Sequence, residues 1–338
     1  MTAPQRVTLA EIAAEAGVSL ATMSKVLNGR TDVAPATRAR LEEHLARHGY
    51  TRRSTAQRSD FVELVFHELE ASWSMEVIEG VEDVAHAAGL SVVLTVSGDR
   101  HEPGPEWIDG VLRRRPAGVI LVFSDIAPKY REKLRSRGIP FVIVDPAGDP
   151  SPDVPSVGSA NWSGGLMATR HLIELGHRRI AAITGPEDMM CSLARVDGYR
   201  SAMNAAGLAI DPELIRFGDF HPDGGEVAAR ELLALDDPPT AFFAGSDLQA
   251  LGVISAGSAA GLRVPDDLSV VGYDDIALSR WMSPQLTTIH QPLRRMGEEA
   301  TRLALRLADG VTPDTLRMDL ATHLVVRGST AAPRPASA

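Results

Sequence analysis

The sequence predicts a small all-α head at the N-terminus, followed by an α/β body of two doubly wound lobes, each built on a parallel sheet. Two observations carry this prediction. Residues 8–50 show the apolar spacing of three short helices. Residues 61–273 instead alternate short, continuous apolar runs with helix-length segments, as βα units do. A chain of 338 residues has room for both parts.

The first two helices of the head are expected to be joined by a tight turn. Thr8 and Glu11 form a capping box that starts the first helix, and Gly17 ends it. Ser19 is expected to cap a second helix that runs to about residue 28. A third helix is predicted over 35–49, and the small residues near the turn suit a helix-turn-helix. The predicted core positions are Leu9, Ile12, Ala13, Ala16, Met23, Val26, Leu27, Leu41 and Leu45.

The charge distribution favours duplex DNA as the partner of this head. Residues 1–59 hold nine Lys or Arg and five Asp or Glu, which gives +4. The whole chain carries −10, so the remaining residues carry −14. A basic head attracts phosphates, whereas an acidic body discourages non-specific coating of DNA. On the pattern alone, a dimerisation or packing module remains the alternative.

The body is predicted to consist of two runs of βα units, separated by the Pro/Asp/Gly-rich stretch 146–155. In such lobes a ligand binds beyond the carboxyl ends of the strands, so a cleft between the lobes is the expected ligand site. The predicted strands are 61–67, 91–97, 118–123, 141–145, 180–184, 241–244 and 268–273. The predicted helices are 75–88, one that ends at 138, 164–175, 195–206, 226–234 and one that ends at 260.

The sequence shows no signature of an enzyme. It contains no G-x-G-x-x-G, P-loop, G-x-S-x-G or H-E-x-x-H motif, so we expect no catalysis and no cofactor. Cys191 is the single cysteine, which excludes a cysteine-rich metal site. A basic-then-apolar leader and a membrane-length apolar run are both missing, so we expect a cytoplasmic protein with no membrane partner. Residues 331–338 are predicted to form a disordered tail.

Two other classes of protein are alternatives to this interpretation. One is a sugar-binding protein of a transporter, which the missing leader and the basic head disfavour. The other is a cytosolic sugar enzyme on a doubly wound fold, which the missing catalytic motifs disfavour.

From about residue 8 to residue 327 the chain resembles bacterial transcriptional regulators of the lactose/galactose repressor (LacI/GalR) family. The head fits the pattern V-T-L-x-x-I-A-x-x-A-G-V-S-x-A-T-x-S-x-V-L-N-G. Each motif of the body is weak alone, but their order and spacing together are specific. These motifs are HLIELGHRRI (171–180), RVDGYR (195–200), SDLQALG (246–252), VPDDLSVVGYDD (264–275) and SPQLTTIHQP (283–292).

The resemblance implies a body like that of periplasmic sugar-binding proteins, with two lobes joined by three crossovers near 157–161, 289–292 and 319–322. It implies a head at 1–50, a short linker at 51–60 and a body at 61–330. The N-lobe would comprise 61–157 and 293–319, and the C-lobe 158–290 and 320–330. A homodimer would bind a near-palindromic operator, and a ligand in the cleft would change the spacing of the two heads. Such a protein would repress genes for carbohydrate uptake or utilisation.

For the head, the resemblance implies that the second helix enters the major groove and reads bases through Leu20, Ala21 and Lys25. Leu20 and Ala21 offer apolar contacts, whereas Lys25 can donate to guanine. In the linker, Arg52, Arg53 and Arg58 would track phosphates or the minor groove, with a solvated flexible linker as the alternative. Residues that match positions contacting the DNA backbone, or that otherwise cap helices, are Thr8, Ser19, Thr22, Ser24, Asn28 and Thr37.

For the effector, the resemblance implies a site made of aromatic faces and of hydrogen-bonding groups that suit a pyranose ring. A mono- or oligosaccharide is therefore expected, with a nucleobase or another metabolite as the alternative. The residues expected at this site are Trp73, Asn161, Trp162, Arg195, Phe220, Ser246, Asp247, Asp274 and Gln291.

Leu251 and Trp281 match positions at the interface between the two bodies of a dimer. Burial in the core of a lobe is their alternative role. The sequence after residue 327 contains no leucine heptad, so we expect no tetramer built by a C-terminal coiled coil.

Overall fold

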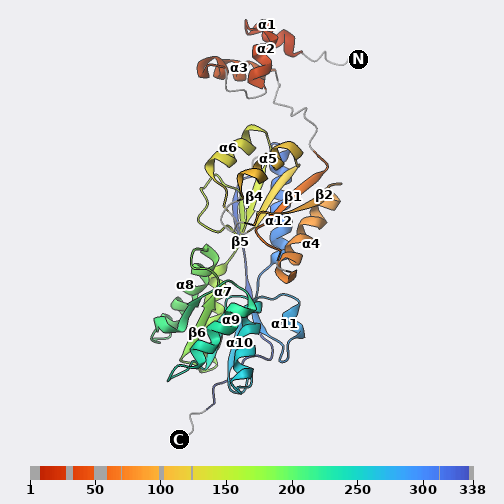
Figure 1. Ribbon diagram of the computed structural model, residues 1–338. Coiled ribbons are helices and arrows are strands. Elements are labelled where there is room, and N and C mark those ends of the chain that lie inside the picture. Colours follow the sequence, from red (N-terminus) through yellow and green to blue (C-terminus); the bar gives the residue numbers. More distant parts are fainter. Residues whose placement is uncertain are drawn as a thin grey trace, which may run out of the picture. The chain divides into compact units, whose positions relative to one another are not determined.

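The computed structural model describes residues 8–27, 33–48, 59–69, 71–98, 103–122, 125–311 and 313–334. They form two compact units, the head before Ser59 and the body that begins there (Figure 1). Among the described helices, none is both long and apolar enough to cross a bilayer. The DNA-contacting roles predicted for Asn28, Arg52, Arg53 and Arg58 fall outside the described residues.

The head consists of three helices whose starts follow the predicted caps. The Thr8 Oγ1 accepts the Glu11 N–H at 3.3 Å, while the Glu11 carboxylate accepts the Thr8 N–H at 2.6 Å. The Ser19 Oγ accepts the Thr22 N–H at 3.1 Å, which caps the second helix. The predicted apolar positions form one core, in which Leu9 and Leu27 are only partly buried. The helices are α1 (Leu9–Glu15), α2 (Leu20–Leu27) and α3 (Pro35–Arg47).

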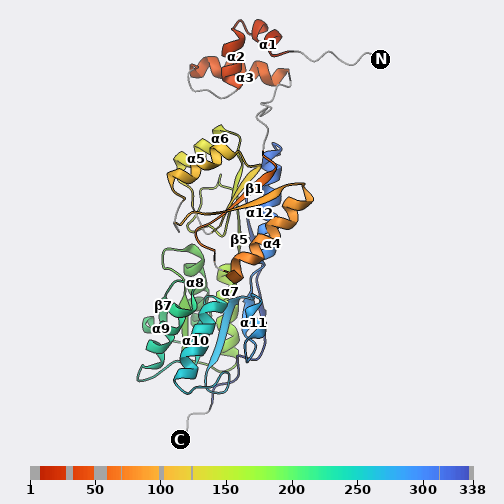
Figure 2. The same cartoon turned by 45° about the vertical axis from the view of Figure 1, so that its right-hand side comes forward.

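The N-lobe of the body is a parallel sheet covered by helices on both faces. Its strands are β1 (Phe61–Phe66), β2 (Ser91–Val96), β3 (Gly118–Val122), β4 (Phe141–Val144), β5 (Ser156–Ser159) and β11 (Arg317–Leu320). Its helices are α4 (Ala71–Ala87), α5 (Pro105–Arg114), α6 (Pro128–Ser136) and α12 (Leu293–Ala308). Strand order is β11-β5-β4-β3-β1-β2. Leu64 packs with α4 and α12, whereas its neighbour Val65 packs with α5 and α6 on the other face (Figure 2).

The C-lobe repeats this architecture, with the order β12-β10-β9-β8-β6-β7. Its strands are β6 (Ile180–Thr184), β7 (Ile215–Phe217), β8 (Ala241–Ala244), β9 (Ser269–Asp274), β10 (Thr287–His290) and β12 (His323–Val325). Its helices are α7 (Asn161–Glu174), α8 (Met190–Ala205), α9 (Pro222–Leu233), α10 (Asp247–Ala259) and α11 (Leu278–Trp281), with the 3-10 turn η1 (Pro212–Leu214). Strand β12 runs antiparallel to β10, so this sheet is parallel except at one edge.

The chain passes between the lobes three times. It crosses from β5 to α7, from β10 to α12, and from β11 to β12. The crossings fall inside the three segments that the resemblance implies. Because the second and third return the chain to the opposite lobe, each lobe contains residues from distant parts of the sequence.

The start of the body is tied to the end of α5. The Ser59 N–H donates to the Arg115 carbonyl at 3.0 Å, and the Ser59 hydroxyl donates to the Arg114 carbonyl at 2.5 Å. The Arg114 guanidinium in turn binds the fully buried carboxylate of Glu63 on β1, through Nε at 3.1 Å and Nη2 at 2.5 Å. The point where the linker ends is therefore fixed to the sheet of the N-lobe.

Part of the predicted disordered tail is bound to the C-lobe. The Ala331 N–H donates to the Ser269 Oγ at 3.0 Å, and its carbonyl accepts a hydrogen bond from the His177 ring. Arg334 forms an ion pair with Asp267. The prediction of disorder is therefore wrong for residues 331–334, because the side chains of Ser269, His177 and Asp267 bind them. Residues 335–338 lie outside the described part.

Helices α7 and α8 cross so closely that only glycine fits between them. A Cβ at Gly165 would overlap the Arg195 carbonyl oxygen, and a Cβ at Gly198 would overlap the Trp162 carbonyl oxygen. The glycines thus set the distance between the two helices.

We expect Gly165→Ala to lower the free energy of unfolding of the body by about 1–3 kcal/mol, because the backbone of α8 must move to accept the methyl group. Urea denaturation measures this change. Gly148→Ala is the matched control, since a Cβ there meets nothing within 4 Å. Equal stability of Gly165→Ala and the wild type would contradict the close crossing.

Candidate functional site

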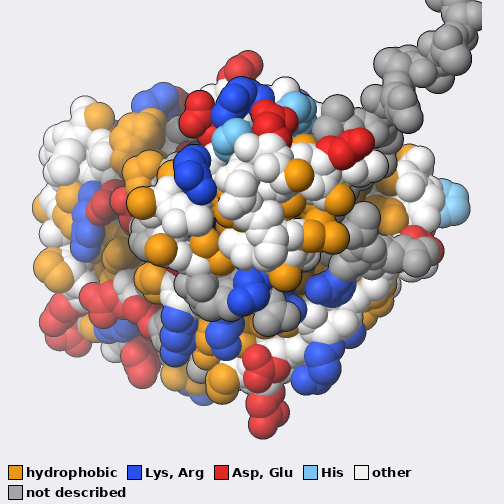
Figure 3. Space-filling model, turned by 90° about the horizontal axis from the view of Figure 1, so that it is seen from above, with side chains coloured by type: hydrophobic (Ala, Val, Ile, Leu, Met, Phe, Trp, Pro, Cys, Tyr) orange, Lys and Arg blue, Asp and Glu red, His pale blue; other side chains and the backbone are white. Residues whose placement is uncertain are grey.

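The outward face of α2 presents the three residues predicted to read bases. Leu20 is 52% exposed, and Ala21 and Lys25 are also exposed, while Met23 and Val26 point into the core of the head. In the view of Figure 3, basic, acidic and apolar side chains are interspersed. The α2 face thus combines small apolar contacts with one flexible cation.

The predicted DNA-backbone residues of the head have a structural role as well. The Thr8 and Ser19 side chains cap α1 and α2, and the Ser19 and Thr22 hydroxyls lie 2.9 Å apart. Thr22, Ser24 and Thr37 are half-buried. Capping leaves the hydroxyl lone pairs partly engaged, so these groups fix the starts of α1 and α2.

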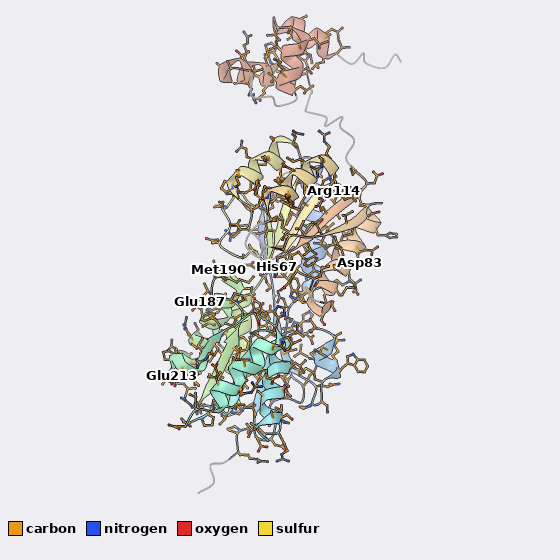
Figure 4. The ribbon with its side chains drawn as sticks, viewed as in Figure 1. His67, Asp83, Arg114, Glu187, Met190 and Glu213 are labelled. Atoms are coloured by element: carbon orange, nitrogen blue, oxygen red, sulfur yellow. The ribbon has the colours of Figure 1, made fainter. Side chains whose placement is uncertain are left out.

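In the body, a cavity of about 280 Å³ lies between the two lobes. Its walls come from the segments that follow β1 in the N-lobe and β6, β7, β8 and β9 in the C-lobe. Figure 4 shows His67, which follows β1, where the N-lobe faces the C-lobe. The cavity therefore lies at the carboxyl ends of the strands, where doubly wound folds bind ligands.

Five of the nine predicted effector residues line this cavity. Trp73 comes from the N-lobe, and its ring meets Phe66 edge-on at 6.4 Å between centroids. Arg195, Phe220, Ser246 and Asp274 come from the C-lobe. Aromatic rings of both lobes thus line a space that also holds a guanidinium, a hydroxyl and a carboxylate.

Arg195 is buried and bound on every nitrogen. Its Nε donates to the Asn161 Oδ1 at 2.9 Å, its Nη1 to the Gly245 carbonyl at 2.5 Å, and its Nη2 to the Gln291 Oε1 at 3.1 Å. Its guanidinium carbon lies 3.7 Å from the Tyr273 ring centroid. Asn161 and Gln291 are absent from the lining of the cavity and bind Arg195, so in this structure they position its guanidinium. Their contact with an effector stays a prediction.

Asp247 does not line the cavity either, and its predicted contact with the effector stays a prediction. It is fully buried, accepts the Ile276 N–H at 2.9 Å and accepts the Thr288 hydroxyl at 2.5 Å. Burial raises the pKa of Asp247 to about 7 against the effect of these hydrogen bonds. Its side chain ties the start of α10 to the end of β9 and to β10, because it points into the lobe and not into the cavity.

Trp162 does not line the cavity either. It stands in the first turn of α7 and is 45% exposed, beside a second hollow between β4, β5 and α8. Asp145, which the sequence analysis missed, lies in the same hollow. The Asp145 Oδ1 accepts the Asn161 amide at 3.3 Å, while its buried Oδ2 has no hydrogen-bond partner among the described residues.

Direct contacts also join the two lobes. The Met190 N–H donates to the Ala147 carbonyl at 2.7 Å, and the His221 Nε2 lies 3.3 Å from the Glu68 carboxylate. Glu68, His221 and Asp219 line the cavity and were not predicted. Glu68 follows β1, and the other two residues follow β7, so the strand-end rule was the signal that could have found them.

The predicted dimer residues differ in exposure. Trp281 on α11 is 85% exposed, which excludes the alternative of a core position for it. Leu251 on α10 is half-buried.

A helix-turn-helix head combined with a two-lobed body around a cavity defines a class of protein, the DNA-binding regulator that responds to a small molecule. Comparison with known families agrees with this class. The family described as "Bacterial regulatory proteins, lacI family" matches residues 8–53, and the "Periplasmic binding protein-like domain" matches residues 169–330.

Relatives and solved structures extend the match to nearly the whole chain. The HTH-type transcriptional regulator CelR of Thermobifida fusca is 38% identical, covering 96% of this chain and 98% of its own. The HTH-type transcriptional repressor PurR of Vibrio atlanticus is 33% identical, covering 88% and 91%. The structure of a CelR–cellobiose complex has a TM-score of 0.73 at 36% identity, covering 96% of this chain and all of that one.

The chain belongs to the lacI family of bacterial regulatory proteins. The structure of the lac repressor dimer bound to operator and the anti-inducer ONPF agrees with the fold, with a TM-score of 0.69 at 27% identity, covering 97% of this chain and all of that one. The family and the fold class predicted from the sequence are thereby confirmed.

The buried carboxyl of Asp145 predicts how stability changes with pH. Burial raises its pKa from 3.8 to about 6, against the lowering effect of Arg195. The folded state therefore binds more protons than the unfolded state between these values, so unfolding becomes easier as the pH rises through this window.

Between the two ends of this window we expect the free energy of unfolding of the wild type to fall by on the order of 2–3 kcal/mol. We expect Asp145→Asn not to show this fall. Urea denaturation at a series of pH values measures the difference between the variant and the wild type. Asp314→Asn, which changes an exposed carboxyl, is the control. Parallel pH profiles of the wild type and Asp145→Asn would refute this assignment.

Proposed function

We propose that this protein is a sugar-responsive repressor of genes for carbohydrate uptake or utilisation, and that it catalyses no reaction. A mono- or oligosaccharide binds in the cavity between the lobes, and a dimer binds a near-palindromic operator through its two heads. The observation that carries the proposal is the joint lining of one cavity by Trp73 of the N-lobe and Phe220 and Asp274 of the C-lobe.

The cavity has the chemistry that a pyranose needs. A sugar ring presents apolar C–H faces, which pack on aromatic rings such as Trp73 and Phe220. Its hydroxyls donate and accept hydrogen bonds, and Asp274 and Ser246 can engage them. The CelR structure, which contains cellobiose, supports a sugar, and cellobiose is therefore the first candidate to test.

Coupling to DNA follows from where the ligand binds. A molecule held by both lobes favours one angle between them, and the three crossovers form the hinge about which that angle changes. In a dimer this rotation changes the distance between the two heads, and with it the affinity for two half-sites about one helical turn apart. Trp281 and Leu251 would contact the second body.

Two measurements on the full chain test the proposal. Tryptophan fluorescence is titrated with sugars, beginning with cellobiose, and with nucleobases as the competing class. DNase footprinting upstream of neighbouring genes is carried out with and without each ligand. We expect one sugar to change both the fluorescence and the footprint.

Asp274→Asn is expected to weaken the sugar response while the ligand-free footprint stays the same, because Asp274 belongs to the cavity and not to the head. A chain that protects no DNA segment, or that responds only to nucleobases, would contradict the proposal.

The base-reading role of α2 makes a separate prediction. Lys25→Ala should weaken binding to the operator by about 1–3 kcal/mol and relax the preference for guanine at one position, because a base-edge hydrogen bond is lost. Fluorescence anisotropy with operator and mutated operator measures both effects. Lys129→Ala removes the same charge from α6 of the body and is the control. A uniform loss for all sequences would assign Lys25 to phosphate contact instead.

A further inference from the structure

We infer that the cavity selects an uncharged sugar and rejects phosphorylated and other anionic sugars, with Glu68 and Asp219 as residues that determine this specificity. The inference rests on the proposed function, since it names the chemical class of the effector of that same cavity. Four features of the structure support it: the charge of the lining, the engagement of Arg195, the state of the helix N-termini, and the position of the two carboxylates.

The charged side chains that line the cavity have no net positive charge, whether its histidines are neutral or protonated. Three carboxylates, those of Glu68, Asp219 and Asp274, face one guanidinium, that of Arg195. With His67 and His221 neutral, the groups sum to about −2, and with both protonated they sum to about zero. A phosphate ester brings up to two further negative charges into a partly desolvated space, where repulsion is stronger than in water.

Arg195 is not available as a phosphate clamp. A guanidinium binds phosphate best through two parallel N–H groups. Here Nη1 is bound to the Gly245 carbonyl, and Nη2 to the Gln291 side chain. Nε donates to Asn161, and one face of the guanidinium lies on Tyr273. Arg195 can still donate a remaining N–H to a hydroxyl, but a bidentate grip on an anion would require it to leave these partners.

Helix N-termini commonly bind anions, but those of the C-lobe at the cavity already hold acceptors of the protein. The Asp219 Oδ1 accepts the His221 N–H at 2.9 Å just before α9, and a Cβ at Gly224 would collide with this carboxylate. The Ser246 Oγ accepts the Gln249 N–H at 3.0 Å at the start of α10. The first N–H of α8 donates to the Ala147 carbonyl. A phosphate would have to displace a carboxylate of the protein from α9.

Glu68 and Asp219 place one carboxylate on each lobe at the exposed side of the cavity. Both side chains are exposed, and Glu68 lies 3.1 Å from the His67 Nε2 and 3.3 Å from the His221 Nε2. Carboxylates only accept hydrogen bonds, as phosphate oxygens do, whereas sugar hydroxyls can donate to them. The same two groups therefore favour a neutral polyol and oppose an anion.

Isothermal titration of the full chain tests this inference. The probes are the sugar with the largest fluorescence response, beginning with cellobiose, and the phosphate ester of the same sugar. We expect the ester to bind at least about tenfold more weakly at low salt, with a smaller difference at high salt. Glu68→Gln and the double variant Glu68→Gln/Asp219→Asn should reduce the difference stepwise.

Glu213→Gln is the matched control, because it removes one negative charge from the outer part of the C-lobe, away from His67 (Figure 4). It should leave the ratio of the two affinities unchanged. Because Asp219→Asn also alters the cap of α9, Glu68→Gln alone tests the contribution of the carboxylates, and the unfolding midpoint of each variant shows that it is folded.

Equal or tighter binding of the ester would overturn the inference, and so would an unchanged ratio in Glu68→Gln. If neither the sugar nor any other sugar of the panel binds, the proposed function itself fails and the inference falls with it. Weak binding of the ester together with tight binding of the sugar would support the inference separately from any effect on DNA.

Discussion

The buried guanidinium of Arg195 is the interaction on which the architecture of the cavity depends. A charge removed from water must be surrounded by acceptors, and here these acceptors come from the start of α7, the end of β8 and the crossover before α12. One side chain thus holds together a helix, a strand end and a hinge segment. It also lies against Tyr273 and lines the cavity, so one residue both forms a wall of the cavity and holds the crossover before α12.

Glycines set the distances between the helices of the C-lobe that surround the cavity. Gly165 allows α7 to approach the backbone of Arg195 itself, and Gly225 allows α9 to approach α10 at Gln249. Among the described residues, the lobes meet through polar contacts such as Met190 with Ala147 and Glu68 with His221. Ile276, Leu248 and Leu278 of the C-lobe also pack with the core of the N-lobe. A two-state hinge requires lobes joined by contacts that can be replaced, since a ligand can then shift the balance between the two states.

Local signals in the sequence predicted the helices of the head and the centres of the strands correctly. Most of the elements that were misplaced or missed depend on residues far away in the sequence. The caps at Thr8 and Ser19 act within one turn, so α1 and α2 begin where expected. In the body, helices α7, α8 and α9 begin three to five residues earlier than predicted, at Asn161, Met190 and Pro222. The residues just before α7 and α8 offer no capping side chain, so the sequence carried no start signal there. Pro222 at the first position of α9 was a start signal that the prediction did not use. Helices α5 and α12 were not placed, nor were short strands such as β7 and β12, whose pairing partners lie far away in the chain.

The same distinction applies to the site. Arg195 and Asp274, which stand in the quoted motifs, and Phe220, whose position matches the family, all line the cavity. Asp247 stands in an equally clear motif, but sequence position does not reveal whether a side chain at a helix start turns into a cavity or into the lobe. Glu68 and Asp219 stand in irregular loops after strand ends, where spacing carries no periodic signal.

The anchor of Ser59 on the last turn of α5 has a mechanical consequence. Because Arg114 joins that turn to the buried Glu63 in the sheet, the place where the linker leaves has little freedom of its own. Ser59 therefore moves with the N-lobe as part of one rigid body. A rotation of the N-lobe moves Ser59, the first described residue of the body, by the same angle.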